Sequence, residues 1–98
     1  MFILVNAGGN LSLQDSDNFR EFSVVDESDG LAVSVLSAIG EVAEDDHFWL
    51  DANAIVELSE RDMDQQWKDS FWEMLAKVEA YGYSNMALQQ VKAHRVSR

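Results

Sequence analysis

The first half of the chain alternates between short apolar runs and polar turn segments. An apolar run that begins at Phe2 stops at Asn6, and it predicts a strand covered on both faces. Turn residues at 7–10 and alternating residues at 11–13 follow, and together these segments predict a β-hairpin. Residues 22–25 predict a third strand. A second continuous apolar run at 47–50 predicts a second central strand.

Helical spacing of apolar residues begins after the third predicted strand. Residues 31–39 carry such spacing between a group of acids at 26–29 and Gly40, which predicts a helix with acidic N-cap residues and a glycine at its C-terminal end. Asp51 is predicted to cap a second, short helix. The apolar residues expected to face inward on it are Ala52, Ile55 and Leu58.

The clearest helix is predicted from Asp64 to Tyr81. Its apolar side chains fall on one stripe, which is typical of an amphipathic helix with one buried face. The stripe consists of Trp67, Phe71, Met74, Leu75, Val78 and Tyr81. Gly82 follows at the position of a C-terminal cap, and Ser84 or Asn85 is predicted to begin a last short helix.

The predicted order of elements is β-β-β-α-β-α-α-α. Because the strands come early and the helices late, the order predicts an α+β fold. We expect residues 1–98 to form a single domain, since a chain of 98 residues is too short for two. The domain is predicted to contain a small, mainly antiparallel sheet of about four strands with the helices packed on one face.

The formal net charge is −11, and it is unevenly distributed. Residues 1–66 carry net −13, whereas residues 67–98 carry net +2. This balance argues against direct nucleic-acid binding, which needs clustered cations, and against docking on an anionic membrane. Two interpretations remain open. The acids keep a cytoplasmic protein soluble, or they form a surface that meets a basic partner or imitates nucleic acid.

The chain contains no cysteine, so disulfides, thiolate catalysis and cysteine-bound metals are excluded. The apolar run at the N-terminus lacks a basic flank and is too short for a signal peptide or a membrane span. The sequence therefore predicts a cytoplasmic protein.

No motif in the sequence predicts catalytic, cofactor-binding or metal-binding residues. The two histidines, His47 and His94, lie 47 positions apart, which argues against a zinc site. We expect His47 to begin a strand and His94 to lie in a solvated tail. The acidic segment at 15–20 begins like a calcium loop but has Arg20 where glycine belongs. Pairs of carboxylates occur by chance among 18 acids and carry no information.

One aromatic side chain falls outside the buried stripe of the long helix. Trp72 lies about 120° from the stripe centre, beside Lys68 and Glu79. A tryptophan on a polar flank either packs under another element or marks an interface. Both interpretations stay open, and Trp72, Lys68 and Glu79 are the predicted candidate interface residues.

Four short segments stand out in the second half of the chain: Trp49-Leu50-Asp51-Ala52, Trp67-x-x-x-Phe71-x-x-Met74-Leu75, Tyr81-Gly82-Tyr83 and Lys92-Ala93-His94. In these segments the chain resembles a group of short uncharacterised bacterial proteins of unknown function. The resemblance covers about half of the chain. It implies a bacterial, cytoplasmic protein and supplies no activity, cofactor or substrate.

Three functional hypotheses follow from these observations. The first is a small, acidic, non-enzymatic interaction or accessory protein, for which a homodimer would be a natural state because a sheet edge or the Trp72 flank needs cover. The second is a nucleic-acid mimic that inhibits a basic protein, with carboxylates in place of phosphates. The third is a small enzyme that uses carboxylates in a pocket between the sheet and a helix.

Overall fold

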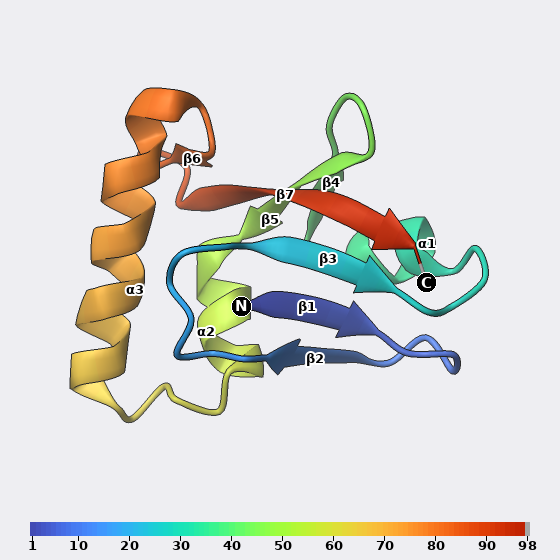
Figure 1. Ribbon diagram of the computed structural model, residues 1–98, viewed down its shortest axis with the longest axis horizontal. Coiled ribbons are helices and arrows are strands. Elements are labelled where there is room, and N and C mark those ends of the chain that lie inside the picture. The colour runs from blue at the N-terminus through green and yellow to red at the C-terminus, as the bar shows by residue number, and fades with distance from the viewer. Residues whose placement is uncertain (98) are drawn as a thin grey trace.

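A computed structural model describes residues 1–97 of the chain. Within these residues it contains seven strands, three α-helices and one short 3-10 helix (Figure 1). In chain order the elements are β1 (Phe2–Val5), β2 (Leu11–Gln14), β3 (Ser23–Asp26), α1 (Ala32–Leu36), β4 (Gly40–Val42), β5 (His47–Asp51), α2 (Ala52–Leu58), α3 (Gln65–Val78), η1 (Glu79–Tyr81), β6 (Ser84–Asn85) and β7 (Gln90–Ser97).

All seven strands belong to one mixed sheet. The strand order is β2-β1-β3-β7-β5-β4, and the short β6 pairs with β7 outside this path. The pairs β1–β3 and β3–β7 are parallel, and the other four pairs are antiparallel. The predictions of an α+β fold and of a mainly antiparallel sheet are therefore confirmed. The prediction of about four strands is wrong, and the parallel centre of the sheet was not expected.

The largest error of the sequence analysis concerns the C-terminal segment. Ser84 and Asn85 were predicted to begin a helix, but they form β6 and pair with Val91 and Gln90 of β7. A tight turn joins the two strands, and Gln89 has a positive φ of 54° there. Along β7 the side chains then alternate between core and surface, which is the period of a strand. The expected tail is thus a central strand, inserted between β3 and β5.

The sequence predicted that Gly40 ends a helix, and this prediction is wrong. It begins β4, an edge strand that the sequence analysis missed, and its register partner is Leu50 of β5. A Cβ atom built on Gly40 would lie 2.1 Å from the carbonyl oxygen of Trp49. Only glycine permits the two backbones to approach this closely.

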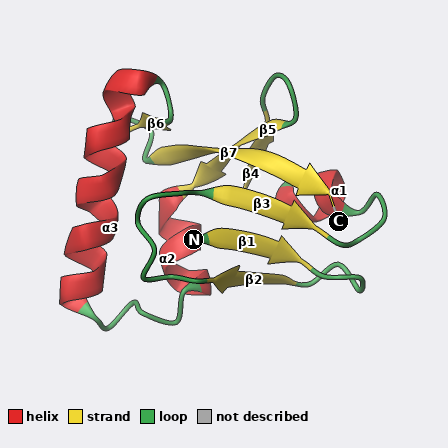
Figure 2. Cartoon of the chain, viewed as in Figure 1, coloured by secondary structure: helices red, strands yellow, loops and turns green. Residues whose placement is uncertain are grey.

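The three helices do not all pack on one face of the sheet. α1 and α2 lie behind the sheet in Figure 1, and α3 runs across the ends at which β1 and β3 begin. Figure 2 shows that no helix of the described residues lies in front of the sheet. The prediction that helices pack on one face therefore holds for α1 and α2, whereas α3 closes one end of the core.

The core lies between the sheet, α2 and α3. Alternate strand residues such as Ile3, Val24 and Leu50 point into it and are fully buried. The stripe of α3 is buried at Trp67, Phe71, Met74 and Leu75, as predicted. The stripe ends earlier than expected, because the helix tightens into η1 after Val78 and leaves Tyr81 78% exposed.

The cap predicted at Asp51 is confirmed, and Asp64 forms a second cap that the sequence analysis did not predict. The side chain of Asp51 accepts a hydrogen bond from the Asn53 amide at 3.0 Å at the start of α2. The side chain of Asp64 accepts one from the Trp67 amide at 3.0 Å at the start of α3. Each bond satisfies a backbone donor that has no partner inside its helix.

Candidate functional site

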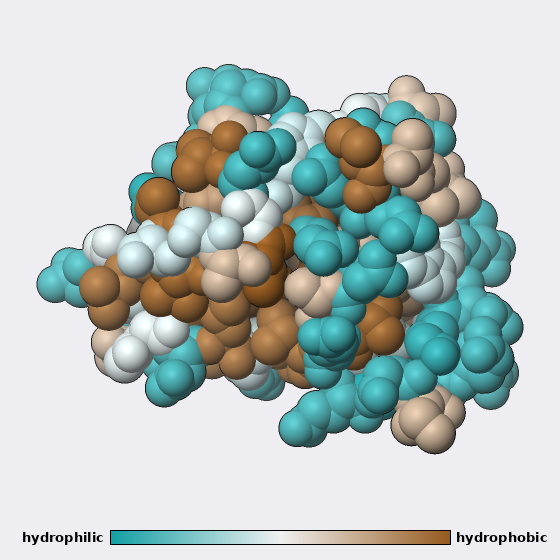
Figure 3. All heavy atoms as spheres, turned by 180° about the vertical axis from the view of Figure 1, so that it is seen from behind, coloured by the Kyte–Doolittle hydropathy of each residue, from teal (hydrophilic) through white to brown (hydrophobic). Residues whose placement is uncertain are grey.

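Exposed apolar side chains gather over α1 and the edge strand β4. Leu31 is 44% exposed, Val33 is 49% exposed and Val42 is 58% exposed. Val35 and Ile39 are half-buried beside them. We call these five residues the α1–β4 patch. Figure 3 shows the molecule from the side of α1, where apolar atoms cover much of the left half of the surface and hydrophilic atoms cover the right.

The patch is exposed because α1 is too short to bury all the apolar side chains of this segment. The helix has five residues and buries Ala32 and Leu36 against the sheet. The surrounding segment 30–40 contains no charged residue, so its remaining apolar side chains have no core position left. Val42 points to the same side of the sheet as Phe48, its register partner, and it is 58% exposed at the sheet edge.

A buried carboxylate positions the start of α1. Asp26, at the end of β3, is 6% exposed and accepts hydrogen bonds from the amide and the hydroxyl of Ser28, at 2.8 Å and 2.5 Å. The Ser28 hydroxyl oxygen in turn accepts a hydrogen bond from the Leu31 amide at 3.1 Å. Ser28 therefore bonds the amide of Leu31, the residue before the helix. The acidic N-cap predicted from residues 26–29 is wrong, because no side chain caps α1.

The pKa of Asp26 lies below its ordinary value of 3.8. Burial is the largest single influence and favours the neutral acid, but the two hydrogen bonds from Ser28 and the charge of Arg95 together outweigh it. The Arg95 guanidinium lies 3.8 Å from the carboxylate. The ionised carboxylate is thus the form that holds the β3–α1 junction together.

We expect Asp26→Ala to destabilise the protein by about 1–3 kcal/mol at neutral pH, since it leaves buried donors without an acceptor. Because the pKa of Asp26 is lowered on folding, its contribution is complete above 3.8 and disappears as the pH falls through the folded value. Urea unfolding of wild type and variant at neutral pH and at about pH 2 should show the difference vanishing in acid. Glu57→Ala, which removes an exposed carboxylate from α2, should show no such loss.

Acids adjoin the α1–β4 patch along the chain. Asp29 precedes it, Glu41 lies within β4, and Asp45 lies in the turn between β4 and β5. Among residues 1–97, none of these three forms an ion pair. Two other acids of the same turn are compensated from β7, where Lys92 pairs with Glu44 and Arg95 pairs with Asp46. The uncompensated charge beside the patch is therefore negative.

Of the three predicted interface residues, Lys68 and Trp72 lie on α3 and Glu79 begins η1. Trp72 is half-buried and packs against the core, edge-on to Phe71 with ring centroids 5.7 Å apart. Glu79 is exposed, and its carboxylate accepts a hydrogen bond from the Met86 amide at 2.7 Å. Lys68 is half-buried on the helix surface. Packing and turn formation account for much of what these side chains do, and their role in an interface stays a prediction.

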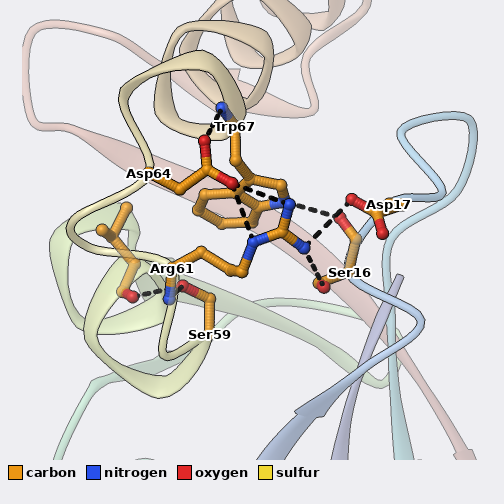
Figure 4. A network of polar contacts seen from close by, with 7 residues as sticks. Ser16, Asp17, Ser59, Arg61, Asp64 and Trp67 are labelled. Atoms are coloured by element: carbon orange, nitrogen blue, oxygen red, sulfur yellow. Dashed lines mark hydrogen bonds and ion pairs between the residues drawn. The ribbon is translucent and has the colours of Figure 1, made fainter.

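A polar network at the start of α3 also has a structural role (Figure 4). Arg61 donates hydrogen bonds to Asp64 at 2.9 and 3.1 Å and to Asp17 at 3.1 Å. The indole nitrogen of Trp67 donates to the Ser16 carbonyl oxygen at 2.8 Å. The hydrogen bond from the Trp67 amide is the main cause that holds the pKa of Asp64 below its ordinary value, and the hydrogen bond from Arg61 is the next. The network ties the α2–α3 connection to the turn after β2.

A cavity of about 220 Å³ lies between α3, β7 and the segment before β3. Its walls are mainly apolar: Phe19, Phe22, Met74, Val78, Tyr83 and Val91 line it together with Arg20, Glu21 and Lys92. Asp26, Glu44 and Asp64 have pKa values lowered by their partners, and none of them lines this cavity. A carboxylate acting as a proton donor would need the opposite shift.

The fold brings the two histidines together, although they lie far apart in the sequence. His47 and His94 are register partners on β5 and β7, and their ring centroids are 4.9 Å apart. The expectation that His94 lies in a solvated tail is wrong, because it lies within β7. No three histidine or acid side chains among residues 1–97 gather closely enough to share a metal ion. No helix of these residues is long and apolar enough to cross a bilayer.

The sequence analysis missed the α1–β4 patch. It assigned Leu31, Val35 and Ile39 to a buried helix face and had no strand at Val42. One signal was present: eleven consecutive residues without a charge, at 30–40, hold more apolar side chains than a short surface helix can bury. Comparison with known proteins gives no match, since no family model, curated protein or solved structure is recognisably related to this chain.

Proposed function

We propose that this chain is a cytoplasmic, non-enzymatic interaction protein that binds a basic protein partner through the α1–β4 patch. The observation that carries the proposal is a group of exposed apolar side chains, Leu31, Val33 and Val42, in a stretch of the chain that is rich in acids. Residues 21–60 contain eleven acids and neither lysine nor arginine. The partner that fits is a protein with an apolar contact surface flanked by lysine or arginine.

Each part of the patch has a separate role in such a complex. Leu31, Val33 and Val42 provide apolar area, which supplies affinity when it is removed from water. Asp29 and Glu41 provide charge, which steers association and selects partners rather than adding much affinity. β4 is also an edge strand, so its outward backbone groups can pair with a strand of the partner.

The charge favours a different protein over a second copy of this chain. Two copies joined through the α1–β4 patch would bring two chains of net −11 together with their acidic surroundings face to face. Like charges placed opposite each other at an interface cost several kcal/mol. The homodimer expected from the sequence is therefore the less favourable occupant of this surface.

Affinity capture with matched variants tests the proposal. Immobilised wild-type protein is used to capture partners from lysate of the native host, and each captured partner is purified and its affinity measured at rising salt. Val33→Ser combined with Val42→Thr should weaken binding by at least about tenfold, because these are the two most exposed apolar residues of the patch. Asp29→Asn combined with Glu41→Gln should mainly reduce the salt dependence.

Met63→Ser is the matched control, because Met63 is 92% exposed and lies outside the patch. It should leave binding unchanged. The proposal is supported by a basic partner whose affinity falls in the patch variant and not in the control. It is contradicted by a partner that binds the patch variant as tightly as wild type, by an acidic partner, or by a wild-type dimer in sedimentation that the patch variant abolishes.

A further inference from the structure

We propose that His47 and His94 form a two-imidazole binding site for a divalent transition metal ion such as Ni²⁺ or Zn²⁺. The site lies on the sheet face that no helix covers, away from the α1–β4 patch, and it is independent of the function proposed above. Neither histidine belongs to the core or to the α1–β4 patch.

The sheet register places both rings on the same face. Phe48 and Ala93 are register partners that point into the core, so the neighbouring pair, His47 and His94, points outward. The ring centroids are 4.9 Å apart and the planes are tilted by 35°. Both residues lie in strands that have a neighbouring strand on each side, so the backbone holds the two Cα atoms opposite each other. Only the torsions of the side chains remain to be adjusted on binding.

Hydrogen bonds determine which nitrogen of His47 is available. Its Nδ1 atom lies 2.9 Å from the carbonyl oxygen of Asp45 and 3.1 Å from that of Glu44. A carbonyl oxygen can only accept, so Nδ1 carries the proton and donates it. In the neutral ring Nε2 is then left with a free lone pair. A ring nitrogen that donates to a backbone carbonyl while the other binds metal is the usual arrangement of a ligating histidine.

The surrounding charges favour a cation. In the turn beside His47, Glu44 and Asp46 are paired with cations, whereas Asp45 forms no ion pair within residues 1–97, and the whole chain carries net −11. Lys92, on the same face, pairs with Glu44 and lies over the Trp49 ring at 5.7 Å from its centroid. Its charge is therefore largely neutralised by the same turn that holds His47.

The ligand set selects the class of metal. Two neutral imidazoles suit Ni²⁺, Cu²⁺ and Zn²⁺, whereas Mg²⁺ and Ca²⁺ prefer oxygen ligands. The protein supplies two ligands, so water occupies the remaining coordination positions. Such a site lies on the finished surface and is not required for the fold, unlike a closed four-ligand structural zinc site.

Calorimetric titration of the tag-free protein with NiCl₂ and with ZnCl₂ tests the inference, together with NMR of the imidazole Hε1 protons during the zinc titration. We expect one ion per chain and a shift of both histidine signals at the same added equivalent. His47→Gln and His94→Gln should each weaken metal binding by at least about tenfold. Substitution of a group that only supports a metal ligand already weakens metal affinity by about 10–100-fold, so loss of a ligand should cost no less. Asp51→Asn, which changes an exposed acid elsewhere, should leave the affinity unchanged.

We expect the histidine variants to fold, because both histidines lie on the surface side of the sheet. Their circular dichroism spectra check this. Unchanged nickel affinity in the double variant His47→Gln/His94→Gln would show that carboxylates bind the metal and would overturn the inference. It would also be overturned if only one histidine signal moved, or if MgCl₂ bound as tightly as NiCl₂.

Discussion

Replacing Phe71 with alanine should destabilise the protein by about 3–5 kcal/mol, the usual cost of emptying a buried aromatic position. Phe71 is completely buried at the middle of α3 and stacks on Trp67, with ring centroids 5.2 Å apart and planes 10° apart. Trp72 contacts the same ring edge-on. Because a domain of this kind has only about 5–15 kcal/mol of total stability, a large fraction of the variant should be unfolded at moderate temperature.

Tyr81→Ala is the matched control, since the sequence places Tyr81 on the same apolar stripe and the structure leaves it 78% exposed. Its effect should stay within about 0.5 kcal/mol, as for most surface substitutions. Urea unfolding followed by circular dichroism measures both variants. Equal losses for Phe71→Ala and Tyr81→Ala would contradict the end of α3 at Val78 and its replacement by η1.

Gly40→Ala is expected to cost at least the upper end of the 1–3 kcal/mol range that overpacking causes. The added Cβ would lie 2.1 Å from the Trp49 carbonyl oxygen and 2.9 Å from the Leu50 Cα, both of which are backbone atoms and cannot turn aside. β4 must therefore separate from β5. Amide hydrogen exchange should show lost protection in β4, and thermal unfolding should show a lower Tm.

Gly8→Ala provides the comparison for Gly40→Ala. A Cβ on Gly8 would meet Asn6 and Asn10 at ordinary contact distances of 3.5 and 3.6 Å, and this glycine does not have a positive φ. Its substitution should change the Tm little. If Gly40→Ala were equally harmless, the close β4–β5 pairing would be wrong, and with it the position of Val42 in the α1–β4 patch.

The sequence by itself determined those features whose causes lie within a few residues. The hairpin of β1 and β2 follows from an apolar run, a turn signal and a short alternating segment. The cap at Asp51 follows from the side-chain oxygen that a helix start requires. The buried face of α3 follows from 3.6-residue spacing, and the excess of acids follows from composition alone.

Only the tertiary structure decided where β7 lies. Residues 90–97 have few strong signals of their own, and they form a strand because β3 and β5 offer backbone partners on both sides. That pairing brings His94 opposite His47, a relationship that a separation of 47 positions conceals. Close approach of β4 to β5, which Gly40 permits, is likewise a contact between segments, so local pattern suggested a helix end instead.

The two proposed surfaces illustrate the same division. Sequence composition determined that the chain is acidic and that residues 30–40 are apolar and uncharged. It did not determine which of those apolar side chains find room in the core. That depends on how many positions the sheet, α2 and α3 leave for α1, and the packed core accepts Ala32 and Leu36 but leaves Leu31, Val33 and Val42 at the surface. Burial is a property of the packed whole, because space in a close-packed interior is shared among all elements.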